Sequence, residues 1–195
     1  MNQWMEAIKA YIPYNEQEEK DKALIVGCME TYNNLLTREN PVAHFSSSGF
    51  IVNKTRDKVL MIHHNIYNAW SWTGGHTDGE TDFLGVAIRE AQEEAGVKVV
   101  TPISKEIFSL DVLPVNGHVK KGVYVSAHLH LSMAYLVEVD EQEELTIKPD
   151  ENSGVRWIPV NELDMYIDNE PDMLLLYKKF MNKIGSSPKC VLDSR

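Results

Sequence analysis

Cysteine, positive charge and long hydrophobic runs are all scarce in this chain. Only Cys28 and Cys190 occur among its 195 residues. Two cysteines so far apart in sequence do not indicate a disulfide scaffold, and they favour a reducing compartment, so we expect a cytoplasmic protein. The N-terminus lacks the apolar core of a signal peptide, and no hydrophobic run approaches the length of a membrane span. We therefore expect no membrane partner.

Acidic residues outnumber basic ones, with 29 Asp and Glu against 19 Lys and Arg and a net charge of −10. This balance argues against a nucleic-acid-binding surface. An acidic protein still binds phosphates where metal ions supply the local positive charge. The hydrophobic fraction of 43% is enough for a packed core. The length indicates one main domain, expected over residues 41–195, preceded by a helical extension over residues 1–40.

The most informative pattern lies at residues 74–97, which read GGHTDGETDFLGVAIREAQEEAGV. Glu90, Glu93 and Glu94 stand at positions i, i+3 and i+4 of a predicted helix, so their carboxylates share one face. Three like charges on one face cost stability unless a positive group lies among them, and Mg²⁺ prefers carboxylate oxygens. Arg89 can hold a carboxylate in place by a charge-assisted hydrogen bond.

The same run of charges is, taken alone, typical of a solvated helix face. Its context favours a metal site instead. The helix has an apolar side made of Phe83, Leu84, Val86, Ala87 and Ala91. Asp82 or Thr81 can cap its start, and Gly96 stands where a helix ends. Gly74 and Gly75 precede it and allow a backbone carbonyl to turn towards a cation. Loop and helix together predict a divalent-metal site.

This pattern resembles the signature of the Nudix hydrolases, G-x5-E-x7-R-E-U-x-E-E-x-G-U, in which U is aliphatic. The positions that agree are Gly75, Arg89, Glu90, Ala91, Glu93, Glu94, Gly96 and Val97. The signature has a glutamate where this chain has Thr81, and Glu80 stands one residue early. We expect Glu80 or Asp78 to take the supporting role of that glutamate, in a loop variant of the Gly-Gly-His type. Residues 75–97 are referred to as the box.

The resemblance extends over about residues 42–170. The segment at 59–76 is similar to the strand and loop before the box in a Nudix subgroup with a Gly-Gly-His loop, and the segments at 128–137 and 151–159 are similar to later parts of the same domain. The resemblance implies an α/β Nudix fold, a mixed β-sheet in an α/β/α sandwich, with the Nudix hydrolase domain at 41–195.

Hydrophobic periodicity and turn residues predict the same class of fold. We expect helices, besides that of the box, over residues 3–11, 16–37, 160–168 and 172–184. We expect strands over residues 43–52, 58–64 and 154–158, one or two strands within 98–113, and one long strand or a pair over 123–139. Helices on both sides of the predicted sheet agree with the sandwich.

The resemblance also implies a function. It is that of a pyrophosphohydrolase that depends on Mg²⁺ or Mn²⁺ and cleaves a nucleoside diphosphate linked to another moiety, or a nucleoside triphosphate. Bound cations lower the pKa of water and clamp the phosphates. The implied metal ligands are Gly75, through its carbonyl, Glu90, Glu93 and Glu94. The implied catalytic residues are Arg89, which orients the carboxylates, and Glu93 or Glu151 as proton acceptor. The expected partner is a small diphosphate, and a homodimer is left open.

Glu151 is the candidate for the distal glutamate that many Nudix hydrolases add beyond the sheet. It lies six residues before Trp157, in an acidic loop. Glu141, Glu143 and Glu144 compete for the same role, and the loop could also be simply a solvated acidic segment.

Three histidines are candidates for binding substrate. His128 and His130 alternate with leucines, so both rings face one side of a strand. On the catalytic side they would touch metal, phosphate or leaving group; otherwise they are satisfied wall residues. His76 directly follows Gly75, so we expect it to rim the metal site and contact substrate or shape the loop.

Two other functions remain open. An isopentenyl-diphosphate isomerase shares the fold and the metal glutamates but uses a cysteine and a glutamate for proton transfer. Neither Cys28 nor Cys190 is expected near the box, which weighs against this alternative. A non-catalytic domain that senses a nucleotide is the other; such domains often lose box carboxylates, whereas all three helix glutamates are present here.

Overall fold

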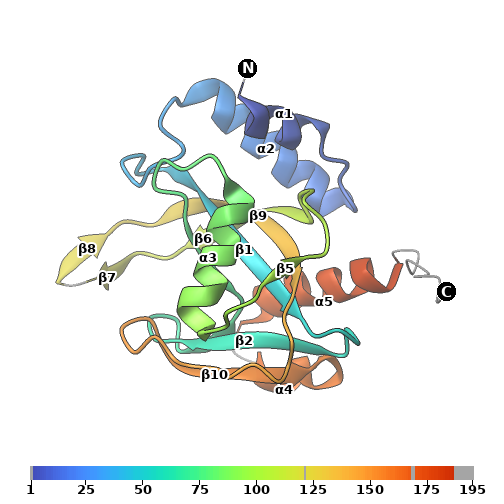
Figure 1. Cartoon of the computed structure of the whole chain (residues 1–195). Coiled ribbons are helices and arrows are strands. Elements are labelled where there is room, and N and C mark those ends of the chain that lie inside the picture. Colours follow the sequence, from blue (N-terminus) through green and yellow to red (C-terminus); the bar gives the residue numbers. More distant parts are fainter. Residues whose placement is uncertain (1, 121, 168–169, 187–195) are drawn as a thin grey trace.

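An eight-stranded mixed sheet organises the computed structural model, which describes residues 2–120, 122–167 and 170–186 (Figure 1). Its strands are β1 (Ala43–Val52), β2 (Lys58–His64), β3 (Ala69–Ser71), β4 (Thr73–His76), β5 (Thr101–Pro102), β6 (Ser109–Val115), β9 (His128–Glu138) and β10 (Asn152–Pro159). The order is β10-β2-β1-β9-β5, while β3 pairs with β2, β4 with β1 and β6 with β9. The β1–β9 pair is parallel and the other pairs are antiparallel, so the sheet is mixed, as predicted.

Helices cover both faces of this sheet. On one face lie α1 (Gln3–Ala10), α2 (Glu16–Thr31) and α3 (Phe83–Ala95), and on the other lie α4 (Leu163–Tyr166), which follows the 3-10 turn η1 (Val160–Glu162), and α5 (Pro171–Ser186). In Figure 1, α3 lies in front of the sheet. Each face has its own apolar cluster, and burial of one large apolar side chain contributes about 1.5–3 kcal/mol relative to exposure. The predicted α/β/α sandwich is confirmed.

β1 has both faces covered, and its burial pattern shows it. Every residue of the strand is buried. Because side chains alternate along a strand, Phe45 and Ile51 belong to the cluster under α3, whereas Phe50 belongs to the cluster under α5. One edge of β1 pairs with β9, and the other pairs first with β4 and then with β2. The strand β4 and the start of β9 therefore lie on either side of β1.

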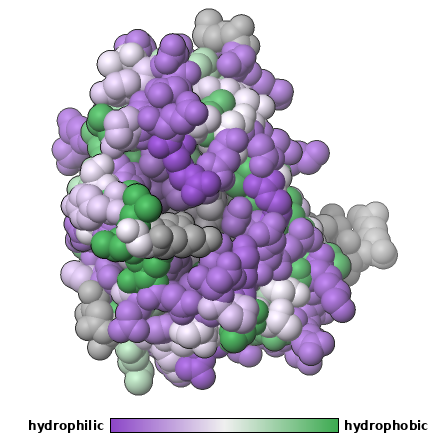
Figure 2. Space-filling model, turned by 90° about the vertical axis from the view of Figure 1, so that its left-hand side faces the viewer, coloured by the Kyte–Doolittle hydropathy of each residue, from purple (hydrophilic) through white to green (hydrophobic). Residues whose placement is uncertain are grey.

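A second, small sheet projects from the body of the molecule. It is the hairpin of β7 (His118–Lys120) and β8 (Val123–Val125), at the left of Figure 1. Val119, Val123 and Tyr124 on this hairpin are exposed. Figure 2 views the molecule from that side and shows a small hydrophobic group in a largely hydrophilic surface.

The N-terminal extension is joined to the sheet and to α5 by a buried ionic network. Glu18 of α2 is fully buried, and its carboxylate lies 3.0 Å from the Nζ of Lys183 and 3.1 Å from that of Lys179. Lys179 also pairs with Asp111 of β6. Burial alone raises the pKa of Glu18, but the hydrogen bond from Tyr11 and the lysine charges outweigh it and lower this pKa to about 2. Glu18 is therefore held as a carboxylate.

Some element boundaries differ from the prediction. The helix expected over residues 16–37 ends at Thr31, because Tyr32 is extended and the carbonyl of Leu35 accepts a hydrogen bond from Phe45 of β1. The segment at 123–139 is a pair of strands, β8 and β9. The helix expected over 160–168 is divided between η1 and α4, and Asp168 lies outside the described residues, as does the end of the predicted domain at 187–195. No helix in the described ranges is long and apolar enough to cross a membrane.

Candidate active site

The glycine pair of β4 lies directly against the box helix. The amide of Gly74 donates a hydrogen bond of 2.9 Å to Oε2 of Glu94. A Cβ at position 75 would lie only 2.5–2.8 Å from the carboxyl atoms of Glu90. A side chain at position 75 would therefore displace the Glu90 carboxylate from this position. The absence of a side chain at Gly75 thus leaves room for the Glu90 carboxylate, a contact that the sequence pattern alone does not show.

The two ends of α3 are held by the residues that the sequence predicted. The Asp82 side chain accepts a hydrogen bond of 3.0 Å from the amide of Gly85, so Asp82 rather than Thr81 is the N-cap. Gly96 ends the helix with a left-handed φ of 73°. Between them, the polar face runs from the buried Glu94, 3% exposed, to Glu93, whose side chain is 47% exposed.

The carboxylates on this face are electrostatically unfavourable for one another. Burial raises the pKa of Glu94 to about 8, although the Gly74 amide opposes the shift. Burial, followed by the charge of Glu93, also raises the pKa of Glu90. Excess negative charge among hard oxygen donors is the environment that a divalent cation such as Mg²⁺ or Mn²⁺ relieves. In donor chemistry the residues present fit such an ion.

Arg89 contacts the loop glutamate more closely than the helix glutamates. Its Nη1 lies 2.9 Å from Oε1 of Glu80, whereas its Nη2 lies 3.8 Å from Oε1 of Glu90 and its Nε 4.0 Å from Oε1 of Glu93. Glu80 thus reaches the box helix through Arg89. Asp78, the other residue considered for this role, instead pairs with Arg38 at 2.6 Å.

Lys148 is a site residue that the sequence did not predict. Its Nζ lies 2.9 Å from Oε2 of Glu93 and 3.1 Å from Oε2 of Glu151. Burial tends to lower the pKa of Lys148, but its bonds with the two carboxylates raise it above the ordinary value. This ammonium group therefore links the box to the distal loop. The one sequence feature that could have indicated a role for Lys148 is its spacing of three residues from Glu151.

Of the acidic residues considered for the distal position, Glu151 lies close to the box helix, since its partner Lys148 also pairs with Glu93. Two of its competitors are engaged elsewhere. Glu141 pairs with Lys58 at 3.0 Å, and Glu143 accepts hydrogen bonds from the amides of Lys98 and Val99.

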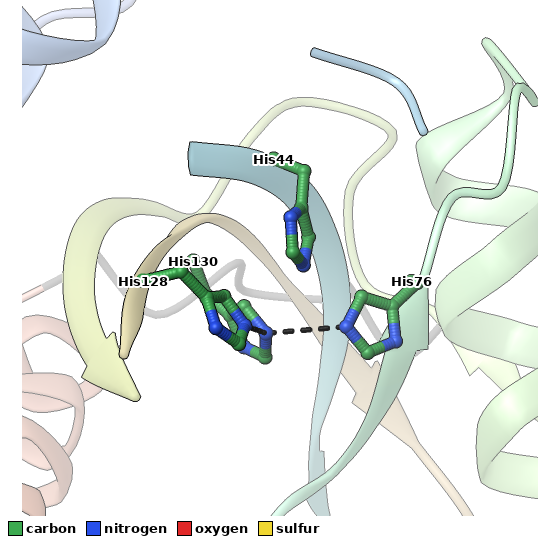
Figure 3. Close-up of side chains that lie close together, drawn as sticks. All are labelled: His44, His76, His128 and His130. Carbon is green, nitrogen blue, oxygen red and sulfur yellow. Dashed lines mark hydrogen bonds between the residues drawn. The ribbon is translucent and has the colours of Figure 1, made fainter. Parts of the chain in front are cut away.

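The three predicted histidines come together (Figure 3). Nε2 of His130 lies 3.2 Å from Nε2 of His76 and 3.3 Å from Nε2 of His128. His44, which the sequence analysis did not single out, completes the group, with its ring centroid 4.7 Å from that of His128. Burial and the neighbouring rings, His76 first, lower the pKa of His130 to about 2, so this ring is neutral.

Comparison with known proteins gives a family match and several structural matches. A family model described as the NUDIX domain matches residues 43–180. A Nudix hydrolase from M. smegmatis has a TM-score of 0.53 at 14% identity, over 78% of this chain and 90% of its own. C. elegans Ap4A hydrolase has a TM-score of 0.51 at 16% identity, over 72% of this chain and 94% of its own. E. coli dihydroneopterin triphosphate pyrophosphohydrolase has a TM-score of 0.51 at 12% identity, over 71% of this chain and 95% of its own.

At these identities the structural matches show similarity of fold alone. No curated protein matches the sequence. The matched range begins at the first strand, so the helices α1 and α2 precede it.

Proposed function

Since this chain belongs to the Nudix family, we propose that it is a pyrophosphohydrolase dependent on Mg²⁺ or Mn²⁺. Its substrate would be a nucleoside diphosphate linked to another moiety, or a nucleoside triphosphate. The observation that carries the proposal is the carboxylate face of α3, against which the backbone of Gly74 and Gly75 packs. Raised pKa values at Glu90 and Glu94 support a site that gains from a bound cation.

The proposed metal ligands are the carbonyl of Gly75 and the carboxylates of Glu90, Glu93 and Glu94. A divalent ion held by them would supply positive charge for the pyrophosphate oxygens and would make a water molecule easier to deprotonate. Proton transfer from that water falls to a carboxylate of this chain. We assign this role to Glu93 or Glu151, and the support is that each is partly exposed and lies beside Lys148 at the edge of the carboxylate face.

The two cationic side chains of the site have different roles in this proposal. Arg89 holds Glu80 against the box helix and so orients the loop between β4, which carries Gly75, and α3. The Lys148 ammonium balances the charge of Glu93 and Glu151 and offers a donor to a substrate phosphate. Contact of His76, His128 and His130 with substrate stays a prediction. In the structure, the rings of these residues contact one another.

The alternative functions gain no support from the site. Cys28 of α2 packs against the apolar cluster under α3, and burial raises the pKa of its thiol. A thiol with a raised pKa in apolar surroundings is poorly suited to the proton transfer of an isomerase. Cys190 lies outside the described residues. A non-catalytic sensing domain would not require the complete set of Glu90, Glu93 and Glu94.

A substrate screen tests the proposal. The purified full chain is incubated with nucleotide sugars, dinucleotides, nucleoside triphosphates and prenyl diphosphates, with Mg²⁺ or Mn²⁺, and the phosphate products are separated. We expect hydrolysis of at least one nucleotide, abolished by EDTA and lowered by several orders of magnitude in Glu93→Gln. The exposed Glu39 supplies the matched control, since Glu39→Gln should keep full activity. Hydrolysis that survives in Glu93→Gln, or isomerisation of a prenyl diphosphate without hydrolysis, would overturn the proposal.

A further inference from the structure

Four imidazole rings meet where β1, β4 and β9 lie side by side (Figure 3). One ring nitrogen from each of His44, His76, His128 and His130 lies within 4.8 Å of those of the other three. Among the described residues, this is the one group of three or more His, Cys, Asp or Glu side chains gathered closely enough to hold a metal ion. We propose that this histidine cluster binds one divalent transition-metal ion, such as Zn²⁺, through its imidazole nitrogens.

The cluster follows from the pairing of three strands. His44 of β1 is the register partner of His130 in the parallel neighbour β9. His76 of β4 lies opposite Ser46, two residues from His44 and hence on the same face of β1. His128 precedes His130 by two residues and shares its face. The backbone thus directs all four side chains to one side of the sheet, so the cluster does not depend on the choice of a single rotamer.

The tautomer of His44 leaves a metal-binding lone pair in the cluster. Its Nδ1 lies 3.2 Å from the carbonyl oxygen of Asn40, which can only accept a hydrogen bond. The proton of the neutral ring is therefore on Nδ1, and Nε2 is an acceptor. This Nε2 is buried and has no hydrogen-bond partner among the described residues, and His44 is only 5% exposed. An unsatisfied buried polar atom destabilises the folded state, and coordination of this nitrogen to a metal would remove that cost.

His128 has the same arrangement. Its Nδ1 lies 2.8 Å from the carbonyl oxygen of Ser126, an arrangement that in a neutral ring leaves Nε2 as an acceptor. That Nε2 faces Nε2 of His130, which also faces Nε2 of His76. Nε2 of the neutral His130 carries at most one proton and can donate to only one of the two. Histidines that bind metals typically donate their other ring N–H to a carbonyl or carboxylate, as His44 and His128 do here.

Distances and donor type both favour a transition metal. In a tetrahedral site with Zn–N bonds of about 2.0–2.1 Å, the ligand nitrogens lie about 3.3–3.4 Å apart. The Nε2 atom of His130 lies 3.2 Å and 3.3 Å from those of His76 and His128. Imidazole nitrogen suits Zn²⁺, Cu²⁺, Ni²⁺ and Fe²⁺, whereas Mg²⁺ prefers oxygen. The imidazole nitrogens of the cluster and the carboxylate oxygens of α3 thus favour different ions.

The histidine cluster and the carboxylate face of α3 lie on opposite faces of β4. Gly75 faces the Glu90 carboxylate of α3, and the next residue, His76, points to the other face. The same division holds along β1, where the Ser47 hydroxyl donates to the carbonyl of Phe83 in α3 while His44 faces the cluster. An ion in the cluster would cross-link β1, β4 and β9 and stabilise the fold, whether or not the box hydrolyses nucleotides.

Cobalt substitution tests the proposal on the full chain. Protein stripped with EDTA and dialysed is titrated with Co²⁺ in excess Mg²⁺, which occupies carboxylate sites. We expect one equivalent of Co²⁺ to give the strong visible absorption of tetrahedral nitrogen coordination, and Zn²⁺ to displace it and raise the Tm. In His44→Gln and His130→Gln the affinity should fall at least about 10-fold, since loss even of a group that only orients a ligand costs that much.

Two variants make the assignment specific. His63, which contacts Ser153 and lies outside the cluster, supplies the control, and His63→Gln should keep the absorption. Glu93→Gln should keep it as well. Absence of the band in the wild-type protein, or its loss in Glu93→Gln with retention in His130→Gln, would overturn the proposal. If His130→Gln fails to fold by circular dichroism, His128→Gln carries the same test, and unchanged affinity there counts against the site.

Discussion

The Nζ of Lys148 lies 2.9 Å from Oε2 of Glu93, so the exposed end of the carboxylate face already holds a positive charge supplied by the chain. A divalent cation that binds Glu93 must compete with this ammonium group. Lys148 belongs to the loop before β10, and it also pairs with Glu151 at 3.1 Å. Metal affinity and the position of the distal loop are therefore linked through one side chain.

Removal of this ammonium should strengthen metal binding. We expect Lys148→Met to bind Mn²⁺ about 2- to 5-fold more tightly, in keeping with the 0.2–1 kcal/mol that partly exposed ion pairs contribute. The measurement is a calorimetric titration of the metal-free protein. Lys178→Met, which breaks the pair with Asp164 on the other side of the sheet, is the control and should leave the affinity unchanged. Weaker Mn²⁺ binding in Lys148→Met would contradict competition between the two cations.

Metal binding at the box should release a proton. Since burial raises the pKa of Glu94 to about 8, its carboxyl is protonated at neutral pH in the metal-free protein and must ionise to become a ligand. Affinity for Mn²⁺ should therefore rise from pH 6 to about 8 and then level off. Calorimetry in buffers of different ionisation enthalpy measures the proton directly. Glu94→Gln should abolish the release, and an equal release in that variant would assign the proton elsewhere.

The same shift affects the stability of the metal-free protein. The pKa of Glu94 in the folded state lies above the ordinary glutamate value of 4.5, so the folded protein binds this proton more tightly than the unfolded chain. Its contribution to stability is complete at low pH and is lost as the pH rises through about 8. The Tm increase caused by Mn²⁺ should accordingly be larger at pH 8.5 than at pH 6.5. A Tm increase that does not change with pH would show that Glu94 is not coupled to the metal.

Glu80 and Glu94 should differ in their effect on turnover. Glu80 contacts Arg89, whereas Glu94 lies under the glycine pair among the proposed ligands. Glu80→Gln should therefore lower turnover about 10-fold, as groups that position ligands do, and Glu94→Gln about 1000-fold. Steady-state rates with the substrate found in the screen give both values. Equal losses would place Glu80 among the metal ligands despite its shifted position in the sequence.

The ionic network of the N-terminal extension makes a separate prediction about stability. Glu18→Ala would remove the buried carboxylate that pairs with both Lys179 and Lys183, and loss of one partner of a buried pair costs about 3–5 kcal/mol. Urea unfolding should show this loss at pH 7. In Glu16→Ala, the exposed first residue of the same helix, the free energy of unfolding should change little.

Local features of the site could be predicted from the sequence, because they depend on neighbours in the chain. Asp82 caps α3 through the amide three residues later, and Gly96 ends the helix through its own φ. His44 and Lys148 could not be found in this way. His44 meets His130 only because β1 and β9 pair in parallel. Register partners in this pair, such as Ser47 and Met133, are 86 residues apart in the sequence. Lys148 reaches Glu93 across 55 residues. Contacts of this kind follow from sheet topology, which hydrophobic periodicity does not determine.

The most direct test of the central claim is hydrolysis in H₂¹⁸O, with the products of a nucleotide substrate analysed by mass spectrometry. The account predicts that, in the presence of Mg²⁺ or Mn²⁺, one ¹⁸O atom appears in a phosphate product of the wild-type protein, because water attacks phosphorus. It also predicts that Glu93→Gln, folded as judged by circular dichroism, forms this product several orders of magnitude more slowly. Product without ¹⁸O on phosphorus, or equal labelling rates in the two proteins, would contradict hydrolysis at the box.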